Sequence, residues 1–267
     1  MKNISVGIVQ MVSGTNVAEN IQSMQRLVRQ AAAAGAEWVV LPEYWPIMGQ
    51  NDTDKVKVAE VFGDGPLQTA LKSLAAELGI VLFGGTIPLQ STDKAKVLNT
   101  MMVYGRAGEL LGFYHKMHLF GFVGANESYA EADTILRGMD VPQLKVDDVS
   151  VAQGICYDLR FPEFFRAQLP FDVLVLPAAF TYTTGKAHWH TLLTARAIEN
   201  QCYLLASAQG GTHQNGRRTF GHSMIINPWG EVLACLPEGE GVITAELNND
   251  FLQSVRSKLP ALQHRIL

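Results

Sequence analysis

Cysteine is scarce in this sequence: its 267 residues contain Cys156, Cys202 and Cys235. These residues lie far apart and form no Cys-x-x-Cys pair, which argues against a disulfide framework and against a zinc site made of thiolates. Such sparse use of cysteine predicts a reducing, cytoplasmic location.

Charge and long apolar runs are limited as well. Charged residues make up 17% of the chain, the formal net charge is -4, and there is no dense Lys/Arg run, so we expect no nucleic-acid partner. No stretch approaches the ~20 apolar residues of a membrane helix. The opening apolar segment is broken by Gln10 and is too short for a signal peptide, so we expect no membrane partner either. The low charged fraction also favours a surface hidden in a homo-oligomer.

Strand-like and helix-like segments alternate along the chain, which predicts an α/β protein. Strands are expected at residues 4–9 and 38–41, and helices after the cap residue Asn16, from Pro66 to Leu78, and over residues 186–201. Hairpins at residues 98–115 and 144–155 predict antiparallel pairs, and therefore mixed sheets. Because no linker or long-period repeat is present, we expect one domain over residues 1–267.

Three reactive side chains directly follow apolar strands. Glu43 comes after residues 38–41, Lys116 after 111–115, and Cys156 after 149–155. Ligands of α/β proteins gather beyond the carboxyl ends of strands. Cys156 stands at a predicted sharp turn into a helix, whose first N–H groups favour the thiolate. The pattern thus brings an acid, a cation and a thiol to strand ends.

The segments that hold these side chains resemble, in order, the three signature blocks of the nitrilase or carbon-nitrogen hydrolase superfamily. The blocks are residues 41–43, 114–119 and 154–163. Later segments look most like the deaminated glutathione amidase branch, followed by the ω-amidases; they are residues 187–189, 196–203, 221–224, 227–230 and 259–265. The resemblance implies an α-β-β-α sandwich with mixed sheets that pairs with a second subunit as a homodimer.

The resemblance also implies a Glu43–Lys116–Cys156 triad. In this interpretation Glu43 takes the thiol proton as Cys156 attacks the carbonyl carbon, and later returns it to the leaving group. Lys116 and the backbone N–H of Tyr157 stabilise the oxyanion. The family carries a second glutamate between the lysine and cysteine blocks, and it is matched here with Glu127, which would orient Lys116 or the substrate amide.

A carboxylated substrate needs a cation, and guanidinium groups offer a bidentate fork for a carboxylate. Arg160, Arg217 and Arg218 are the candidates. Alternatively, Arg160 forms a structural ion pair with Asp158 or Glu163. Arg217 and Arg218 lie in a Gly/Asn-rich segment over residues 210–219, and their alternative role is that of solvated loop residues. The aromatic side chains expected to wall the substrate pocket are Phe180, Tyr182 and Trp189.

Histidine pairs do not predict a metal site. His188 and His190 do not share one face of the predicted helix, while His115 and His118 lack a matching Asp, Glu or Cys cluster. Two Gly-Gly pairs lack the context of a nucleotide-binding loop. We therefore expect no metal and no cofactor.

Together these features predict a cytoplasmic, cofactor-free amidase that releases ammonia from a small carboxylated amide through a thioester on Cys156. Deaminated glutathione is the favoured substrate. The same triad serves an ω-amidase acting on α-ketoglutaramate, a nitrilase or a carbamoyl hydrolase, which stay as alternatives. Two alternatives lie outside the enzyme class: a binding protein that keeps the fold without turnover, and a redox sensor at Cys156.

Overall fold

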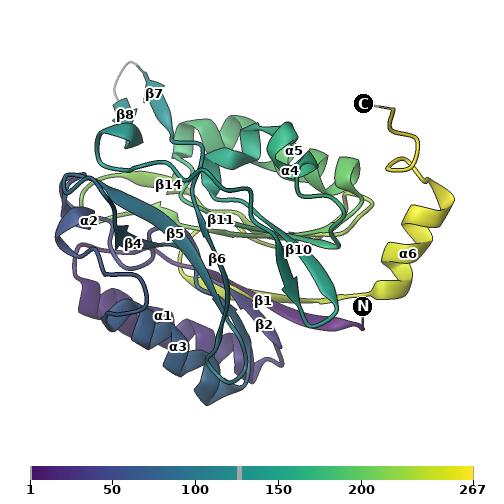
Figure 1. Ribbon diagram of the computed structural model, residues 1–267, viewed down its shortest axis with the longest axis horizontal. Helices are drawn as coiled ribbons and strands as arrows, with labels where there is room; N and C mark the ends of the chain where they lie inside the picture. The colour runs from purple at the N-terminus through teal and green to yellow at the C-terminus, as the bar shows by residue number, and fades with distance from the viewer. Residues whose placement is uncertain (1, 125–127, 267) are drawn as a thin grey trace.

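Two β-sheets stacked face to face form the centre of the computed structural model, and helices cover the outer face of each sheet (Figure 1). The structure describes residues 2–124 and 128–266. The layers run helix, sheet, sheet, helix, so the predicted α-β-β-α sandwich with mixed sheets is confirmed. No helix in the described part of the chain is long and apolar enough to cross a membrane.

The first sheet has seven strands in the order β17-β1-β2-β3-β5-β4, with β6 paired to β5. Their bounds are β1 (Ile4–Gln10), β2 (Trp38–Val40), β3 (Val81–Phe83), β4 (Ile87–Gln90), β5 (Val97–Tyr104), β6 (Leu110–His115) and β17 (Gly241–Leu247). Strands β1, β2 and β3 are parallel, while β5 and β6 form the predicted antiparallel hairpin. Helices α1 (Val17–Ala33) and α3 (Pro66–Leu78) cover the outer face, and the short α2 (Asp54–Lys57) lies near β4.

The second sheet has six strands in the order β16-β15-β12-β11-β10-β9. Their bounds are β9 (Leu144–Val146), β10 (Val149–Gln153), β11 (Val173–Ala178), β12 (Tyr203–Ala208), β15 (Ser223–Ile226) and β16 (Val232–Leu236). Helices α4 (Pro162–Arg166) and α5 (Tyr182–Asn200) cover it. The remaining elements are β7 (Gly121–Val123), β8 (Ser128–Ala130), β13 (Gly210–Thr212), β14 (Arg218–Phe220), the 3₁₀ turns η1 (Glu131–Asp133) and η2 (Cys156–Arg160), and α6 (Asn249–Lys258).

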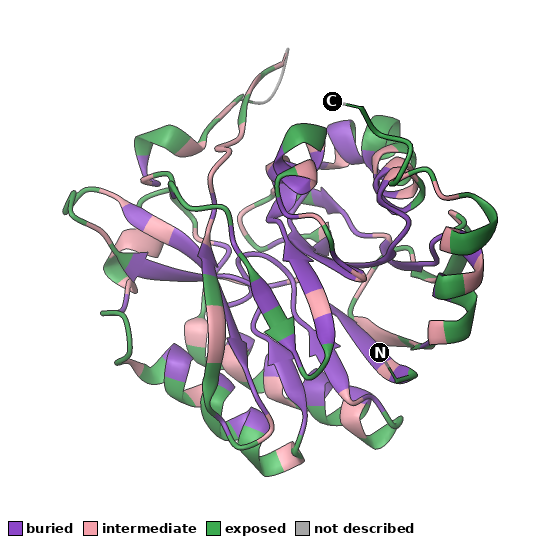
Figure 2. Cartoon of the chain, turned by 45° about the vertical axis from the view of Figure 1, so that its right-hand side comes forward, coloured by how far each residue is buried: buried purple, intermediate pink, exposed green. Residues whose placement is uncertain are grey.

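The inner strands are apolar on both faces because both faces are covered. In β2, Trp38 and Val40 point into the core between the sheets, while Val39 points into a second core under α1 and α3. Strand β3 repeats this alternation with Phe83 on the inner face and Leu82 on the outer. Figure 2 shows the inner strands as buried, while outer strands such as β6, β16 and β17 carry exposed and half-buried residues. A central sheet pair packed this way holds the ends of its strands in fixed positions.

Several local predictions are confirmed, and two are corrected. Asn16 caps α1 by accepting hydrogen bonds from two backbone N–H groups of the first turn. The helix expected over residues 186–201 begins earlier, at Tyr182, because Thr181 caps it by accepting from the N–H of Thr184. The segment over residues 210–219, expected as a loop, is instead the hairpin of β13 and β14.

Candidate active site

Glu43, Lys116 and Cys156 come together in the interior, although they follow strands of two different sheets. Glu43 lies just after β2, Lys116 directly after β6, and Cys156 just after β10. The Lys116 Nζ is 2.8 Å from Oε1 of Glu43, and both side chains are fully buried. Cys156 is 7% exposed, and its thiol interacts with the Glu43 carboxylate. Stacking the two sheets therefore joins strand ends that are far apart in the sequence.

The two oxygens of Glu43 have different environments. Oε1 accepts hydrogen bonds from Lys116 and, at 2.9 Å, from Nδ2 of the buried Asn99. Oε2 is buried and has no hydrogen-bond partner among the described residues. A buried carboxylate oxygen without a donor is costly. Oε2 is thus the oxygen left to take a proton from the neighbouring thiol of Cys156.

A carboxylate that the sequence did not single out, Glu131, holds Lys116 from the other side. Its two oxygens lie 2.9 and 2.8 Å from the Lys116 Nζ, and they also accept from the hydroxyl of Tyr44 and the N–H of Phe120. Glu127, matched with the second glutamate of the family, lies outside the described residues. Both carboxylates fall between the lysine and cysteine blocks, so spacing alone did not distinguish them.

Burial dominates the protonation of this cluster. It raises the pKa of the Cys156 thiol well above its ordinary value, and the Glu43 charge adds to this effect. Burial also raises the pKa of Glu43, although the charge of Lys116 opposes it. Burial alone would lower the pKa of Lys116, but the charges of Glu131 and Glu43 outweigh it, and the net shift is upward. The resting state therefore pairs a neutral thiol with a carboxylate that protonates readily.

The α-helix whose first N–H groups were expected to favour the thiolate does not directly follow Cys156. The residues that follow form only the 3₁₀ turn η2, which supplies little dipole, and desolvation of the thiol prevails. The turn itself is sharp: Cys156 has a φ of 49°, a left-handed conformation that is uncommon for a residue with a side chain. The carboxylate of Asp158 steadies it by accepting from the N–H of Ile155 and the hydroxyl of Tyr114.

A small hollow opens beside the thiol. Its lining residues are Phe120, Cys156, Tyr157, Arg160, Ala179, Phe180, Thr181 and Thr184. Phe180 therefore lies where a pocket wall was predicted. Arg160 faces the rings of Tyr157 and Phe180, with its guanidinium 5.7 and 5.5 Å from their centroids, and it contacts His188 Nδ1 at 3.3 Å. The alternative ion pair between Arg160 and Asp158 is not formed, because the Asp158 oxygens interact with Tyr114, His118 and the N–H of Ile155.

Two predicted wall residues and one arginine lie elsewhere. Trp189 is fully buried behind Phe180, with its Nε1 donating to the carbonyl of His222, so it belongs to the core. Tyr182 packs on Phe220. The guanidinium of Arg218 lies 3.7 Å from the centre of the Tyr182 ring and pairs with Glu238 at the surface. These three residues line neither the hollow at the thiol nor the larger cavity beside it.

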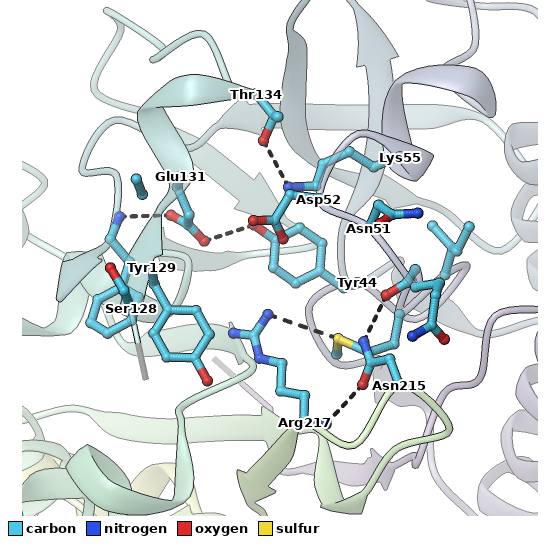
Figure 3. Close-up of a pocket in the computed structure, with 16 residues that line it drawn as sticks. Tyr44, Asn51, Asp52, Lys55, Ser128, Tyr129, Glu131, Thr134, Asn215 and Arg217 are labelled. Carbon is cyan, nitrogen blue, oxygen red and sulfur yellow. Dashed lines mark hydrogen bonds between the residues drawn. The ribbon is translucent and has the colours of Figure 1, made fainter. Parts of the chain in front are cut away.

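The larger cavity has a volume of about 250 Å³ and adjoins the hollow, because Phe120 lines both. Figure 3 shows Lys55, Glu131 and Arg217 directed into it around the ring of Tyr44. Of the predicted arginines, Arg217 therefore lines the larger cavity, while Arg160 lines the hollow at the thiol. Within the described residues, no group of three His, Cys, Asp or Glu side chains is arranged to hold a metal ion.

The stacked sheets, with a buried acid, ammonium and thiol at one edge, are the features expected of a hydrolase. The carbon-nitrogen hydrolase family model matches residues 5–257. A Synechocystis protein named deaminated glutathione amidase is 40% identical over 272 residues, which cover 100% of this chain and 99% of that protein. A human protein of the same name is 33% identical over 267 residues, covering 97% and 81%.

Solved structures agree with these sequence matches. The Caenorhabditis elegans NitFhit protein superposes with a TM-score of 0.90 at 31% identity, covering 100% of this chain and 66% of that chain. A Saccharomyces cerevisiae member of branch 10 of the nitrilase superfamily gives 0.88 at 28% identity, covering 100% and 97%. The chain belongs to the carbon-nitrogen hydrolase family, as its three signature blocks predicted.

Proposed function

We propose that this protein is an amidase that hydrolyses the C–N bond of a small carboxylated amide, with deaminated glutathione as the leading candidate. The observation that carries the proposal is the buried Glu43 carboxylate, which is held through Oε1, has no donor to Oε2 among the described residues, and interacts with the Cys156 thiol. The names of the relatives at 33–40% identity support the choice of substrate.

In the acylation half of the reaction, Glu43 Oε2 takes the thiol proton while Cys156 Sγ bonds to the carbonyl carbon. The negative charge on the carbonyl oxygen is stabilised by the Lys116 ammonium and the Tyr157 N–H. The Lys116 ammonium has three hydrogen-bond contacts, one with Glu43 and two with the carboxylate of Glu131. Because one contact is enough to hold Glu131, one N–H can turn toward the oxyanion. The C–N bond then breaks as Glu43 passes its proton to the departing nitrogen.

In the deacylation half, Glu43 accepts a proton from water, and the resulting hydroxide attacks the thioester carbon. The C–S bond breaks, the carboxylic acid leaves, and the proton held by Glu43 returns to Cys156. In deaminated glutathione the amide nitrogen carries the rest of the peptide, so the departing group there is an amine, which corrects the ammonia expected from the sequence. Ammonia departs only from primary amides such as α-ketoglutaramate.

The experiment that tests this proposal measures amine and ammonia release from deaminated glutathione, α-ketoglutaramate, a nitrile and a carbamoyl compound. Wild-type protein is compared with Cys156→Ala, and Cys235→Ala, an exposed cysteine, is the matched control. We expect the Cys156 variant alone to lose turnover, with the largest wild-type kcat/KM on deaminated glutathione. Full turnover by the Cys156 variant would refute the role of this thiol.

The two readings outside the enzyme class make different predictions. A redox sensor needs an exposed thiolate, whereas Cys156 is buried and its pKa is raised by that burial. A silent binding protein would form no covalent adduct. Intact-mass measurement during turnover distinguishes these, because the amidase is expected to accumulate an acyl group on Cys156.

We further propose that residues 1–267 act as one carbon-nitrogen hydrolase domain in a cytoplasmic homodimer. Three cysteines without a disulfide support a reducing location. Large apolar side chains that remain exposed support a subunit interface; Ile198, Trp229, Val232 and Leu233 lie at the end of α5, in the turn before β16 and in β16. Light scattering on the purified protein tests the dimer, which a monomer mass would contradict.

A further inference from the structure

We propose that Lys55 and Arg217 form a two-cation receptor for a carboxylate of the substrate, so that the enzyme selects amides with an acid group remote from the scissile bond. This inference rests on the proposed amidase function and names the residues that set its substrate class. It adds Lys55, which no sequence pattern indicated, and separates Arg217 from the neighbouring Arg218.

Lys55 projects from α2 into the larger cavity (Figure 3). Its Nζ donates to Oγ1 of Thr134 at 2.9 Å and lies 5.7 Å from the centre of the Tyr44 ring. Burial lowers its pKa, and the charge of Asp52 partly compensates. Among the described residues Lys55 has no carboxylate within ion-pair distance, so at least one N–H of this ammonium is available to a ligand.

Arg217 enters the same cavity from the opposite side of the Tyr44 ring, just before β14 (Figure 3). Its guanidinium lies 4.8 Å from the centre of the Tyr129 ring, and Nη1 lies 3.9 Å from the Met48 sulfur. Its Nε is buried with no hydrogen-bond partner in the described part of the chain. Buried donors are normally satisfied. A carboxylate is the group that a guanidinium fork fits best.

The distribution of charge between the thiol and the larger cavity orients the substrate. At the thiol, the carboxylates of Glu43 and Glu131 outnumber the Lys116 ammonium, which leaves one excess negative charge when Glu43 is ionised. The larger cavity is lined by two cations, Lys55 and Arg217, and by two carboxylates, Asp52 and Glu131, of which Glu131 is already paired with Lys116. With Glu131 counted at the thiol, the two cations outnumber the one remaining carboxylate. An anionic end of the substrate is therefore repelled from Cys156 and attracted to the two cations, while the uncharged amide goes to the thiol.

The two cavities adjoin each other at one side chain. Phe120 lines the hollow at Cys156 and the larger cavity, and the N–H of Phe120 is fixed by Glu131, the carboxylate that holds Lys116. The receptor and the reacting atoms are thus tied to one another through Glu131. The receptor therefore predicts a substrate whose carboxylate lies in the larger cavity while its amide lies at Cys156.

The test compares glutaramate, a primary amide with a carboxylate at the other end, with 5-methylhexanamide, in which an isopropyl group replaces the carboxylate. Ammonia release from both is measured for wild type, Lys55→Met and Arg217→Met. We expect each variant to lose about 10- to 100-fold in kcat/KM on glutaramate, which corresponds to one charge-assisted hydrogen bond. Turnover of the uncharged amide should stay near the wild-type rate.

Matched controls remove other cations. Lys57→Met changes an exposed lysine of the same helix that pairs with Asp54, and Arg106→Met changes a partly exposed arginine that pairs with Asp147. Neither control should alter the preference for glutaramate. If Arg217→Met fails to fold, Arg217→Lys is used; it keeps the charge but loses the fork, and we expect a partial loss on glutaramate only.

Binding provides a readout that does not depend on turnover. Calorimetry with the Cys156→Ala protein should show glutaramate binding that weakens at least about tenfold when Lys55→Met is added, and much weaker binding of 5-methylhexanamide. Equal losses on both amides, or no loss on either, would overturn the receptor. Absence of any amide turnover by wild type would instead count against the amidase function, and the binding comparison would still decide the receptor.

Discussion

The contact between Asn99 and Glu43 offers a quantitative test of how the general base is controlled. Nδ2 of Asn99 donates to Oε1 of Glu43 at 2.9 Å, and both side chains are buried. The substitution Asn99→Leu removes this donor while nearly preserving the shape of the side chain. Lys116 remains as the second donor to the same oxygen.

The expected size of the effect follows from the charge of the acceptor. A hydrogen bond to a charged group contributes about 1.5–3 kcal/mol, and a pKa change of one unit corresponds to about 1.36 kcal/mol. Removing a donor to the ionised form favours the protonated form, so the pKa of Glu43, already raised by burial, should rise further. The acid limb of activity should therefore move to higher pH by about 1 to 2 pH units.

The assay is kcat/KM for the preferred amide as a function of pH, because this quantity reports the ionisation of the free enzyme. Wild type should lose activity on acidification at a pH above the ordinary glutamate value of about 4.3. At high pH, where Glu43 is ionised in both proteins, the variant should approach the wild-type rate. Asn3→Leu is the matched control, since Asn3 donates to Glu246 at the surface. An acid limb that does not move, or a loss equal at every pH, would refute the reasoning.

Three further predictions concern the same cluster and its surroundings. Lys116→Met leaves two buried carboxylates without their cation and should lower the free energy of unfolding by about 3–5 kcal/mol at neutral pH. Urea titrations should show a smaller loss of this free energy near pH 5, where a carboxyl protonates. Equal losses at the two pH values would contradict this prediction. Glu131→Gln should lower kcat by about 10- to 100-fold, more than Glu127→Gln does, and parallel kinetics of the two variants show which glutamate serves Lys116. Trp189→Phe should destabilise the fold by about 1–3 kcal/mol, because it leaves the His222 carbonyl without its donor. KM should stay unchanged, and an altered KM would indicate that Trp189 contributes to the substrate pocket.

Much of the fold was predictable because its signals are local. Asn16 before an apolar periodic run predicted the start of α1, and the segments around residues 98–115 predicted the hairpin of β5 and β6. The start of α5 was misplaced because the cap Thr181 was not recognised. The hairpin of β13 and β14 was missed because both strands are only three residues long and β13 begins with two glycines, which have little β propensity.

The residues of the site likewise fall into those with a local sequence signal and those whose role depends on distant contacts. Short segments next to strand ends identified Glu43, Lys116 and Cys156, since each lies in a contiguous block with a recognisable pattern. Glu131 and Asn99 were not found, because their roles come from contacts across 15 and 56 residues of sequence. Spacing also did not separate Arg217, which enters the cavity, from Arg218, which pairs with Glu238 at the surface. Arg217 lies in the turn before β14 and Arg218 is the first residue of that strand, so the path of the backbone in the hairpin separates the two side chains.

The sequence by itself determined the layered class of the fold, the hydrolase family and the three residues at its chemical centre, because these depend on patterns within short segments. Only the tertiary structure decided the state of that centre. Burial overrides the expected helix effect and keeps the Cys156 thiol neutral, and a distant carboxylate, Glu131, takes up Lys116. Desolvation and contacts between separate strands exist only after the two sheets have packed together, so no stretch of residues encodes them locally.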